Sequence, residues 1–198
     1  PGLAREINVQ GTINLIDVCD KNQLIFYGST GSNYGSVKDI CTESTPLHPL
    51  SLYGETKTKA EELLLERGNI IAYRFATAFG VSPRLRLDLL VNDFANKCFI
   101  FGMNNVDKMI NNVYNVGDDS MNYNKEEVCK MIGSKTNAFI HYEEIGEDAD
   151  KRNYIVSYDK IKNLGFKTNI TMRDGINEII EILKVIDFEN TYTNAKYF

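Results

Sequence analysis

The sequence predicts an α/β protein with a doubly wound parallel sheet and a smaller α+β lobe. Short apolar runs have the length of buried strands, small polar loops follow them, and helical patterns lie between them. The clearest unit consists of the run 23–27 (QLIFY), the helical pattern 51–67 and the run 69–73 (NIIAY). Ligands of such sheets bind at the carboxyl ends of the strands, so the loops that leave these runs are expected to form a site.

Each element of the first half has its own sequence signal. Helices repeat apolar residues every three or four positions, and loops collect Gly, Ser and Pro. The expected elements are a helix over 1–20, a strand over 23–27, a loop over 28–35, a polar loop over 40–50, a helix from Ser51 to about Gly68, and a strand over 69–73. Ser51 is a suitable N-cap, whereas Asn8 and Gly11 are poor helix formers inside the first helix.

The second half alternates less regularly, which favours a smaller lobe. The expected elements are a helix over 89–98, the start of a strand over 99–102, a strand over 113–117, a helix over 125–132 after Asn124, a strand over 138–142, a helix over 158–164 after Ser157, a last helix after Thr171 whose apolar stripe reaches Ile186, and a loose tail over 190–198. Asn, Ser and Thr before these helices are typical N-caps.

Composition narrows the class of protein. The 198 residues carry a net charge of −5, which disfavours a nucleic acid or an anionic membrane as partner, because both require a dense basic surface. No run approaches the roughly 18 apolar residues of a membrane helix, and no signal peptide is recognisable. The four scattered cysteines form no CxxC pair and the two histidines are isolated. We therefore expect reduced thiols, no metal site and a cytoplasmic protein.

Tyr53 and Lys57 form the centre of the predicted chemistry. If Ser51 starts a helix, these side chains lie on one face, one turn apart. The ammonium group would favour the phenolate, so the pair could act as a tunable acid and base. A hydroxyl from Thr30 could bond to the same substrate oxygen. Without flanking motifs, a Tyr near a Lys on a helix would indicate only core packing and a solvated charge.

Six motifs occur in one order along the chain and together resemble one family. They are Asn8–Thr12 (NVQGT), Ser29–Gly35 (STGSNYG), Tyr53–Lys57 (YGETK), Arg74–Gly80 (RFATAFG), Tyr114–Gly117 (YNVG) and Ser157–Phe166 (SYDKIKNLGF). Their order resembles the extended short-chain dehydrogenase/reductase family, in particular its nucleotide-sugar epimerases, dehydratases and dehydrogenases. The stretch Ser82–Phe94 resembles the branch that contains bacterial GDP-heptose 4-dehydrogenases.

The resemblance implies a Rossmann-like sheet, NAD as cofactor with NADP left open, and a nucleotide-diphosphate sugar as substrate. It implies that residues 1–83 are the C-terminal part of a dinucleotide-binding Rossmann domain. Residues 84–198 would form mainly a substrate-binding lobe, from which some segments return to the first domain. It also implies a homodimer, formed through the helices 51–67 and 89–98.

The resemblance assigns roles to single residues. Tyr53 would be the general acid and base at a sugar hydroxyl, Lys57 would hold the nicotinamide ribose, and Thr30 would steady the sugar oxygen. The residues implied in cofactor binding are Asn8, Ser29, Tyr53, Lys57, Phe75 and Ala76, and those implied in substrate binding are Ser32, Thr77, Arg84, Arg86 and Asp88. Alternatively, Asn8 bonds to nearby backbone in its helix, and Arg84 and Arg86 are solvated surface residues.

Two features depart from the family pattern. The sequence contains no Gly-rich turn of the GxGxxG type, and no acidic residue follows at the expected spacing. Near Gly102–Met103, a segment and a helix of the family pattern are also lacking. We therefore expect a truncated product, or joined pieces of a longer chain, in which the N-terminal part of the sheet is missing.

The residues after Thr30 bear on the reaction. The family's dehydratases place an Asp–Glu pair directly after their catalytic Thr, whereas Gly31 and Ser32 stand there in this sequence. Dehydration is therefore disfavoured. C4 epimerisation and net C4 oxidation or reduction of a nucleotide sugar both stay open. The alternative is a non-catalytic protein that binds a nucleotide sugar or dinucleotide, or a truncated remnant.

Overall fold

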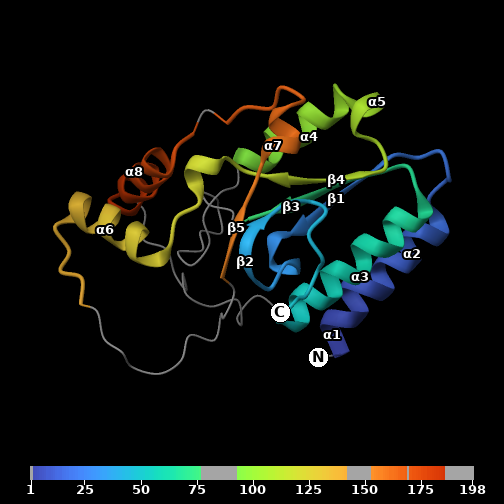
Figure 1. The fold of residues 1–198 in the computed structure, drawn as a ribbon, viewed down its shortest axis with the longest axis horizontal. Helices are drawn as coiled ribbons and strands as arrows, with labels where there is room; N and C mark the ends of the chain where they lie inside the picture. Colours follow the sequence, from blue (N-terminus) through green and yellow to red (C-terminus); the bar gives the residue numbers. More distant parts are fainter. Residues whose placement is uncertain (1, 77–92, 142–152, 169, 186–198) are drawn as a thin grey trace.

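A three-stranded parallel sheet forms the centre of the molecule (Figure 1). The computed structural model describes residues 2–76, 93–141, 153–168 and 170–185. The sheet has the order β1–β3–β4 and consists of β1 (Ile25–Thr30), β3 (Ile70–Phe75) and β4 (Asn112–Val116). Both pairs of neighbours run parallel. The strands expected over 23–27, 69–73 and 113–117 are confirmed, with shifted ends.

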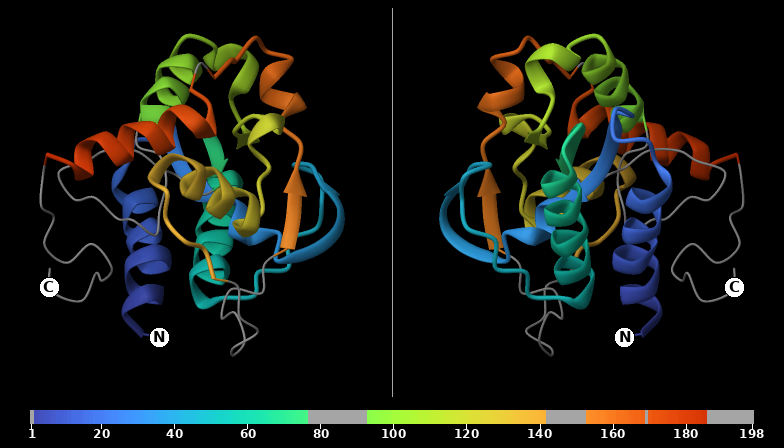
Figure 2. Two further views of the ribbon diagram at one scale, coloured as in Figure 1. Left: turned by 90° about the vertical axis from the view of Figure 1, so that its left-hand side faces the viewer. Right: turned by 90° about the vertical axis from the view of Figure 1, so that its right-hand side faces the viewer.

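Helices cover both faces of this sheet, as Figures 1 and 2 show. Successive side chains of a strand alternate between faces. On β3, Ile70 and Ala72 pack towards α2 (Gly11–Val18) and α3 (Leu52–Arg67). Ile71 and Tyr73 pack on the opposite face, in the cluster that contains Cys98 of α4 (Asp93–Met103). The doubly wound α/β class predicted from the sequence is confirmed.

The first helix is continuous but irregular. It comprises α1 (Gly2–Arg5), a π-helical segment η1 (Glu6–Gln10) and α2. The expected helix over 1–20 is therefore confirmed in its described part, and the irregular segment contains Asn8. Single π-helical segments of this kind often occur at functional sites.

Helix α3 begins and ends where the sequence predicts. The Ser51 hydroxyl accepts a hydrogen bond from the backbone N–H of Gly54 (3.1 Å), which satisfies one of the free donors of the first turn. At the other end, Gly68 has a φ of +79° and closes the helix. Helix α3 then leads directly into β3.

A second, two-stranded parallel sheet was not predicted. It pairs β2 (Ser36–Cys41) with β5 (Asn153–Val156). Loops were predicted over 28–35 and 40–50 and no element over 36–39, because β2 carries charged residues and exposes most of its side chains. β1 also continues through Thr30, where a 3₁₀ turn η2 (Gly31–Asn33) begins, so the expected loop over 28–35 is shorter than predicted.

Two expected strands in the second half are wrong. Residues 99–102 belong to α4, because Cys98, Phe99 and Gly102 recur at helical spacing and face the aromatic side chains under the sheet. Residues 138–141 form no strand; Ile140 instead lies against Gly133 at the end of α6 (Lys125–Thr136), and Phe139 is 90% exposed.

Helices α6 and α8 (Met172–Leu183) pack together at one end of the molecule (Figure 1). Both begin with a capping box, Asn124 with Glu127 and Thr171 with Asp174, so these two predicted N-caps are confirmed. Ser157 was predicted to cap the helix over 158–164, but the N-cap position there is Tyr158, which makes no side-chain cap hydrogen bond; the Ser157 hydroxyl instead accepts from the N–H of Asp159 (3.2 Å). The helix expected over 158–164 is shorter, α7 (Asp159–Lys162). Other described elements are α5 (Val106–Met109) and the 3₁₀ turn η3 (Asp119–Met121).

Some predictions fall outside the described residues. These include the start of the helix over 89–98, Ile186 and the tail over 190–198. The proposed domain boundary after residue 83 also lies there, so the division into two domains stays a prediction. No helix in the described ranges is long and apolar enough to cross a membrane. Among the same residues, no three His, Cys, Asp or Glu side chains are grouped as metal ligands would be.

Candidate active site

The carboxyl ends of β1, β3 and β4 lie side by side. In the register of the sheet, Thr30 is the partner of Phe75, and Ser29 is the partner of Arg74. Thr30 is only 8% exposed, and its hydroxyl accepts a hydrogen bond from the N–H of Ser32 (3.1 Å) at the start of η2. The same hydroxyl donates to the Ser32 hydroxyl (3.1 Å). Thr30 is thus held at the sheet edge where parallel α/β proteins bind ligands.

The first turn of α3 rests on this edge. A Cβ added at Gly54 would lie 3.2 Å from the carbonyl oxygen of Ser32 and 2.9 Å from Cβ of Pro49. Only a glycine therefore lets the helix approach η2 so closely. Tyr53 precedes this contact residue and is 53% exposed. Its phenol is open to a ligand from the side of α3.

Lys57 lies one turn further along α3 and is half-buried. Its ammonium nitrogen lies 4.2 Å from the centre of the Tyr27 ring. The Tyr27 hydroxyl donates to the carbonyl oxygen of Lys57 (3.3 Å), which fixes the same turn from β1. Burial lowers the pKa of Lys57, and the negative charge of Glu61 opposes this effect.

Tyr27 supports Lys57 as a neutral phenol. Burial raises the pKa of Tyr27, and the charges of Glu61 and Tyr53 raise it further. The ring therefore keeps its proton for the bond to α3 and presents its electron-rich face to the ammonium group. Sequence reasoning did not single out this residue.

Asn8 reaches from the π-helical segment to α3. Its side-chain N–H donates to the Thr56 hydroxyl (2.9 Å), which in turn donates to the carbonyl oxygen of Tyr53 (3.1 Å). The amide thus bonds across to another helix, in contrast to the alternative of a bond to nearby backbone. Asn8 braces the turn of α3 that carries Tyr53, while its role in cofactor binding stays a prediction.

Tyr154 of β5 stands beside the residue that follows Thr30. A Cβ added at Gly31 would lie 3.1 Å from the Tyr154 hydroxyl and 3.5 Å from the carbonyl oxygen of Phe75. A side chain at position 31 would therefore meet the phenol. The ring of Tyr154 also packs edge-on against Tyr34, with the ring centres 6.0 Å apart. No sequence pattern pointed to Tyr154, because β5 itself was not predicted.

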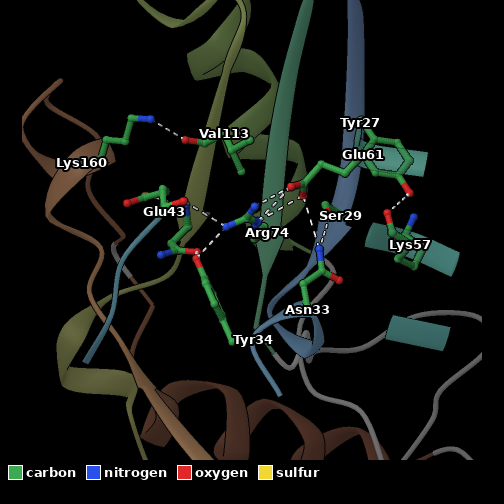
Figure 3. A network of polar contacts seen from close by, with 11 residues as sticks. Tyr27, Ser29, Asn33, Tyr34, Glu43, Lys57, Glu61, Arg74, Val113 and Lys160 are labelled. Atoms are coloured by element: carbon green, nitrogen blue, oxygen red, sulfur yellow. Dashed lines mark hydrogen bonds and ion pairs between the residues drawn. The ribbon is translucent and has the colours of Figure 1, made fainter. Parts of the chain in front are cut away.

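A buried polar network lies below these residues (Figure 3). Arg74 of β3 donates to the Glu61 carboxylate from two of its nitrogens and to the Tyr34 hydroxyl from the third. Tyr34 donates to the side-chain oxygen of Asn115 on β4 (2.7 Å). Asn33 links Glu61 to the Ser29 hydroxyl. Glu61 is a single acidic residue on the buried face of α3, and Arg74 is a single basic residue in the buried strand β3. Two opposite charges at buried positions could have indicated this ion pair from the sequence.

The remaining predicted residues divide into two groups. Ser32 is buried in η2, and Ala76 is exposed directly after β3, next to Phe75. Thr77, Arg84, Arg86 and Asp88 lie outside the described residues. The structure thus brings together Thr30, Ser32 and Phe75 at one edge and sets α3, which carries Tyr53 and Lys57, against it.

The fold is that of a Rossmann-like α/β protein, with Thr30 at the carboxyl end of β1 and helix α3 set against the turn that follows it. Residues 1–108 match the family model of the NAD dependent epimerase/dehydratase family. The match covers more than half of the chain, which therefore belongs to this family.

Two curated relatives show how much of such proteins the chain represents. It is 26% identical over 215 aligned positions to the "Putative UDP-glucose 4-epimerase" of Methanocaldococcus jannaschii, covering 90% of this chain and 70% of that protein. It is 35% identical over 89 residues to the "Uncharacterized UDP-glucose epimerase YtcB" of Bacillus subtilis, covering 41% of this chain. That second match spans 28% of the relative's length.

A solved structure has the same fold. The dTDP-glucose 4,6-dehydratase of Bacillus anthracis in complex with NAD superposes with a TM-score of 0.74 at 21% identity. The likeness covers 91% of this chain and 68% of that one. At this level of identity it supports the Rossmann-like architecture and leaves the reaction to be argued from the site.

Proposed function

We propose that the protein is an epimerase that uses NAD to invert C4 of a nucleotide-diphosphate hexose, with UDP-hexoses as the first candidates. The observation that carries the proposal is the placement of α3. Its first turn, which carries the exposed Tyr53 phenol, rests on η2, and η2 directly follows Thr30. The half-buried Lys57 lies one turn further along the same helix, with its ammonium over the Tyr27 ring of β1. Membership of the family and the printed names of the relatives support the nucleotide-sugar class.

In this proposal the three side chains divide the work. Tyr53 takes the proton of the sugar C4 hydroxyl and later returns it, and Lys57 supplies the positive charge that favours the phenolate. The Thr30 hydroxyl, held by Ser32, orients the same oxygen. NAD, when bound, would supply the hydride chemistry at C4. Lys57 would also hold the ribose next to the nicotinamide.

The residues present fit one end of the dinucleotide. Ser29, Phe75 and the exposed Ala76 lie at the ends of neighbouring strands, and the Lys57 ammonium is fixed above Tyr27 one turn from Tyr53. This arrangement suits the nicotinamide and its ribose. A Gly-rich turn for the diphosphate is not among the 198 residues, so we assign no residue to that part. NAD is the cofactor that the family name supports, and NADP stays the alternative.

Dehydration is the less favoured reaction. Elimination of water from the sugar requires a further acid and base, and no carboxylate follows Thr30 at positions 31 and 32. The space beside Gly31 is taken by the Tyr154 hydroxyl, whose reach leaves little room for an acidic side chain there. Net oxidation at C4 uses the same three side chains and differs only in the fate of the hydride.

Product analysis of the full-length protein tests the proposal. Incubated with NAD and UDP-glucose or UDP-galactose, it should interconvert the two sugars without net formation of reduced nicotinamide. Net absorbance of reduced nicotinamide would instead indicate a C4 dehydrogenase. Bound NAD and nucleotide sugar without any product would support the alternative of a binding protein and contradict an enzymatic role.

Tyr53→Phe gives the matched test of the acid and base. Loss of the phenolic proton should lower turnover roughly a hundred- to ten-thousandfold, the usual contribution of such proton transfer. Tyr123→Phe, a change at an exposed tyrosine outside the site, is the control and should leave turnover unchanged. Full turnover in Tyr53→Phe would remove the assignment.

We also propose a homodimer. The helix Gly2–Val18 runs alongside α3 and exposes the apolar side chains Leu3 (65%) and Ile7 (59%). The interface predicted through α3 and residues 89–98 stays a prediction, because residues 89–92 lie outside the described part of the chain. The exposed apolar side chains beside α3 make α1 and α2 a further part of the proposed interface.

A further inference from the structure

Glu61 is a buried carboxylate one turn beyond Lys57 on α3. It is 1% exposed, although it lies on a helix with solvent on its far side. Its partner Arg74, from β3, is 5% exposed, and the guanidinium Nε lies 3.2 Å and 3.1 Å from the two carboxylate oxygens. A second nitrogen of Arg74 bonds to the same carboxylate. The contact is therefore a bidentate ion pair between helix and sheet.

The same carboxylate also reaches the segment that carries Thr30. The side-chain N–H group of Asn33 lies 3.5 Å from a Glu61 oxygen and donates to the Ser29 hydroxyl (3.2 Å). Asn33 is the last residue of η2 and is fully buried. Figure 3 shows Glu61 between Arg74 and Asn33, with Tyr27 and Lys57 on its other side.

The charges around Lys57 are few among the described residues. Tyr27 faces it from β1, and Tyr53 and Glu61 lie one turn before and after it on α3. Arg74 lies behind Glu61 on β3. Glu61 is therefore the negative charge that offsets the desolvation of the ammonium group, and it is shared with a second cation.

An ion pair of this kind is poorly explained by stability alone. Two buried charges pay a large desolvation cost, and well-packed apolar residues often hold a helix to a sheet equally well. A carboxylate adds directional hydrogen bonds, because its two oxygens bond to Arg74 and Asn33 at the same time. The carboxylate therefore links this turn of α3 to β3 through Arg74 and to η2 through Asn33.

We propose that Glu61 is a positioning residue of the proposed active site, whose buried carboxylate holds the Lys57 turn of α3 to the segment that carries Thr30. The proposal rests on the proposed function, because Thr30 and Lys57 are given their roles there. In this proposal Asn33 connects the Glu61 carboxylate to Ser29, the residue before Thr30.

Glu61→Gln in the full-length protein tests the proposal, with Glu62→Gln as the control. Glu62 is the next residue on α3 and pairs with Lys59 at the surface. A misplacement of about 1 Å can cost a hundredfold in rate, so kcat should fall about a hundredfold in Glu61→Gln with a much smaller change in KM. The alkaline limb of the pH profile should move to lower pH. Glu62→Gln should match the wild type in both.

Two readouts do not depend on turnover. Carbon-13 NMR of labelled lysines, assigned with Lys57→Gln, should show Lys57 titrating at lower pH in Glu61→Gln. Amide exchange should show the Ser32 N–H, which is bonded to Thr30, exchanging faster in Glu61→Gln. If no nucleotide sugar is turned over by the wild type, the proposed function fails, while these two measurements still decide the role of Glu61.

Asn33→Ala tests the positioning of the Thr30 segment without removing the negative charge of Glu61. It also covers the case in which Glu61→Gln does not fold. It leaves the pair of Glu61 and Arg74 intact and cuts only the link to Ser29. Faster exchange at Ser32 and a lower kcat, with an unchanged Lys57 titration, are expected. Wild-type exchange, kcat and pH profile in folded Asn33→Ala, or in folded Glu61→Gln, would overturn the proposal.

Discussion

At the scale of single residues, Gly31 and Tyr154 are fitted to each other. The Tyr154 hydroxyl would lie 3.1 Å from a Cβ at position 31, which is closer than an unstrained contact allows. Gly31→Ala should therefore destabilise the fold by about 1–3 kcal/mol through overpacking. Urea denaturation of the full-length protein measures the change as a lower midpoint with an unchanged slope.

The double variant supplies the control for this prediction. Tyr154→Phe removes the hydroxyl, and the next ring atom, 3.5 Å from the added Cβ, makes an ordinary contact. The cost of Gly31→Ala should be clearly smaller in the Tyr154→Phe background, because the two changes are directly coupled. Additive costs would show that the phenol does not limit position 31.

The Tyr27 ring should raise the pKa of Lys57, because the ammonium group lies over the ring face. A cation held over a ring face gains about 0.5–2 kcal/mol, and one pKa unit corresponds to about 1.4 kcal/mol. Tyr27→Leu should therefore lower the pKa of Lys57 further, by roughly 0.4 to 1.4 units. Tyr27→Phe keeps the ring and should lower it much less. NMR titration of Lys57 compares the two, and equal shifts would exclude a contribution from the ring.

At the scale of elements, the sequence predicted those whose signal is local. Ser51, Asn124 and Thr171 mark helix starts because their side chains satisfy free N–H groups of the first turn. β2 and β5 escaped prediction because short, partly exposed strands depend on a partner distant in sequence. Residues 99–102 read as strand because of their aromatic content, whereas packing under the sheet makes them helical.

The candidate site divides in the same way. Thr30, Tyr53 and Lys57 stand in recognisable spacings, so the sequence could propose them without knowing the fold. Tyr154 and the link through Asn33 arise from contacts between distant segments, which no local pattern contains. Glu61 and Arg74 lie between these cases, because a lone charge on a buried face predicts a partner but does not say which one.

The capping box of α8 should control its first turn. Thr171 accepts from the N–H of Asp174, and Asp174 accepts from Thr171 in return. Thr171→Ala should cost about 1 kcal/mol, seen as faster amide exchange in the first turn of α8. The first turn of α6 has its own box at Asn124 and serves as internal control. Equal effects on both helices would indicate global destabilisation instead of a lost cap.

The same box gives a pH dependence. Hydrogen bonds from Thr171 hold the pKa of Asp174 below its usual value. A carboxylate with a lowered folded-state pKa contributes stability above its unfolded-state value of about 3.9, and this contribution is lost as the pH falls through the folded-state pKa. Protection of the first turn of α8 should therefore decline in acid below about pH 4. Asp174→Asn should remove that decline.

At the scale of the whole molecule, the helices on one face of the sheet have apolar side chains on two sides, one towards the sheet and one towards solvent. α2 and α3 cover one face of β1, β3 and β4, and their inner side chains fill that core. Leu3 and Ile7 point away from this core and face water, so a second surface that covered them would gain the free energy of their burial. An apolar face on a helix pair beside the site is typical of an interface between subunits.

Introducing negative charge on this apolar face should separate the subunits. A buried glutamate facing its symmetry mate is strongly unfavourable, so the double variant Leu3→Glu with Ile7→Glu should shift the full-length protein from dimer to monomer in light scattering coupled to size exclusion. Phe139→Glu, at a side chain that is 90% exposed outside these helices, should leave the dimer intact. A monomeric wild type, or a dimer insensitive to the double variant, would contradict this interface. Because Asn8 of the same helix braces the turn that carries Tyr53 through Thr56, loss of the dimer should also lower turnover.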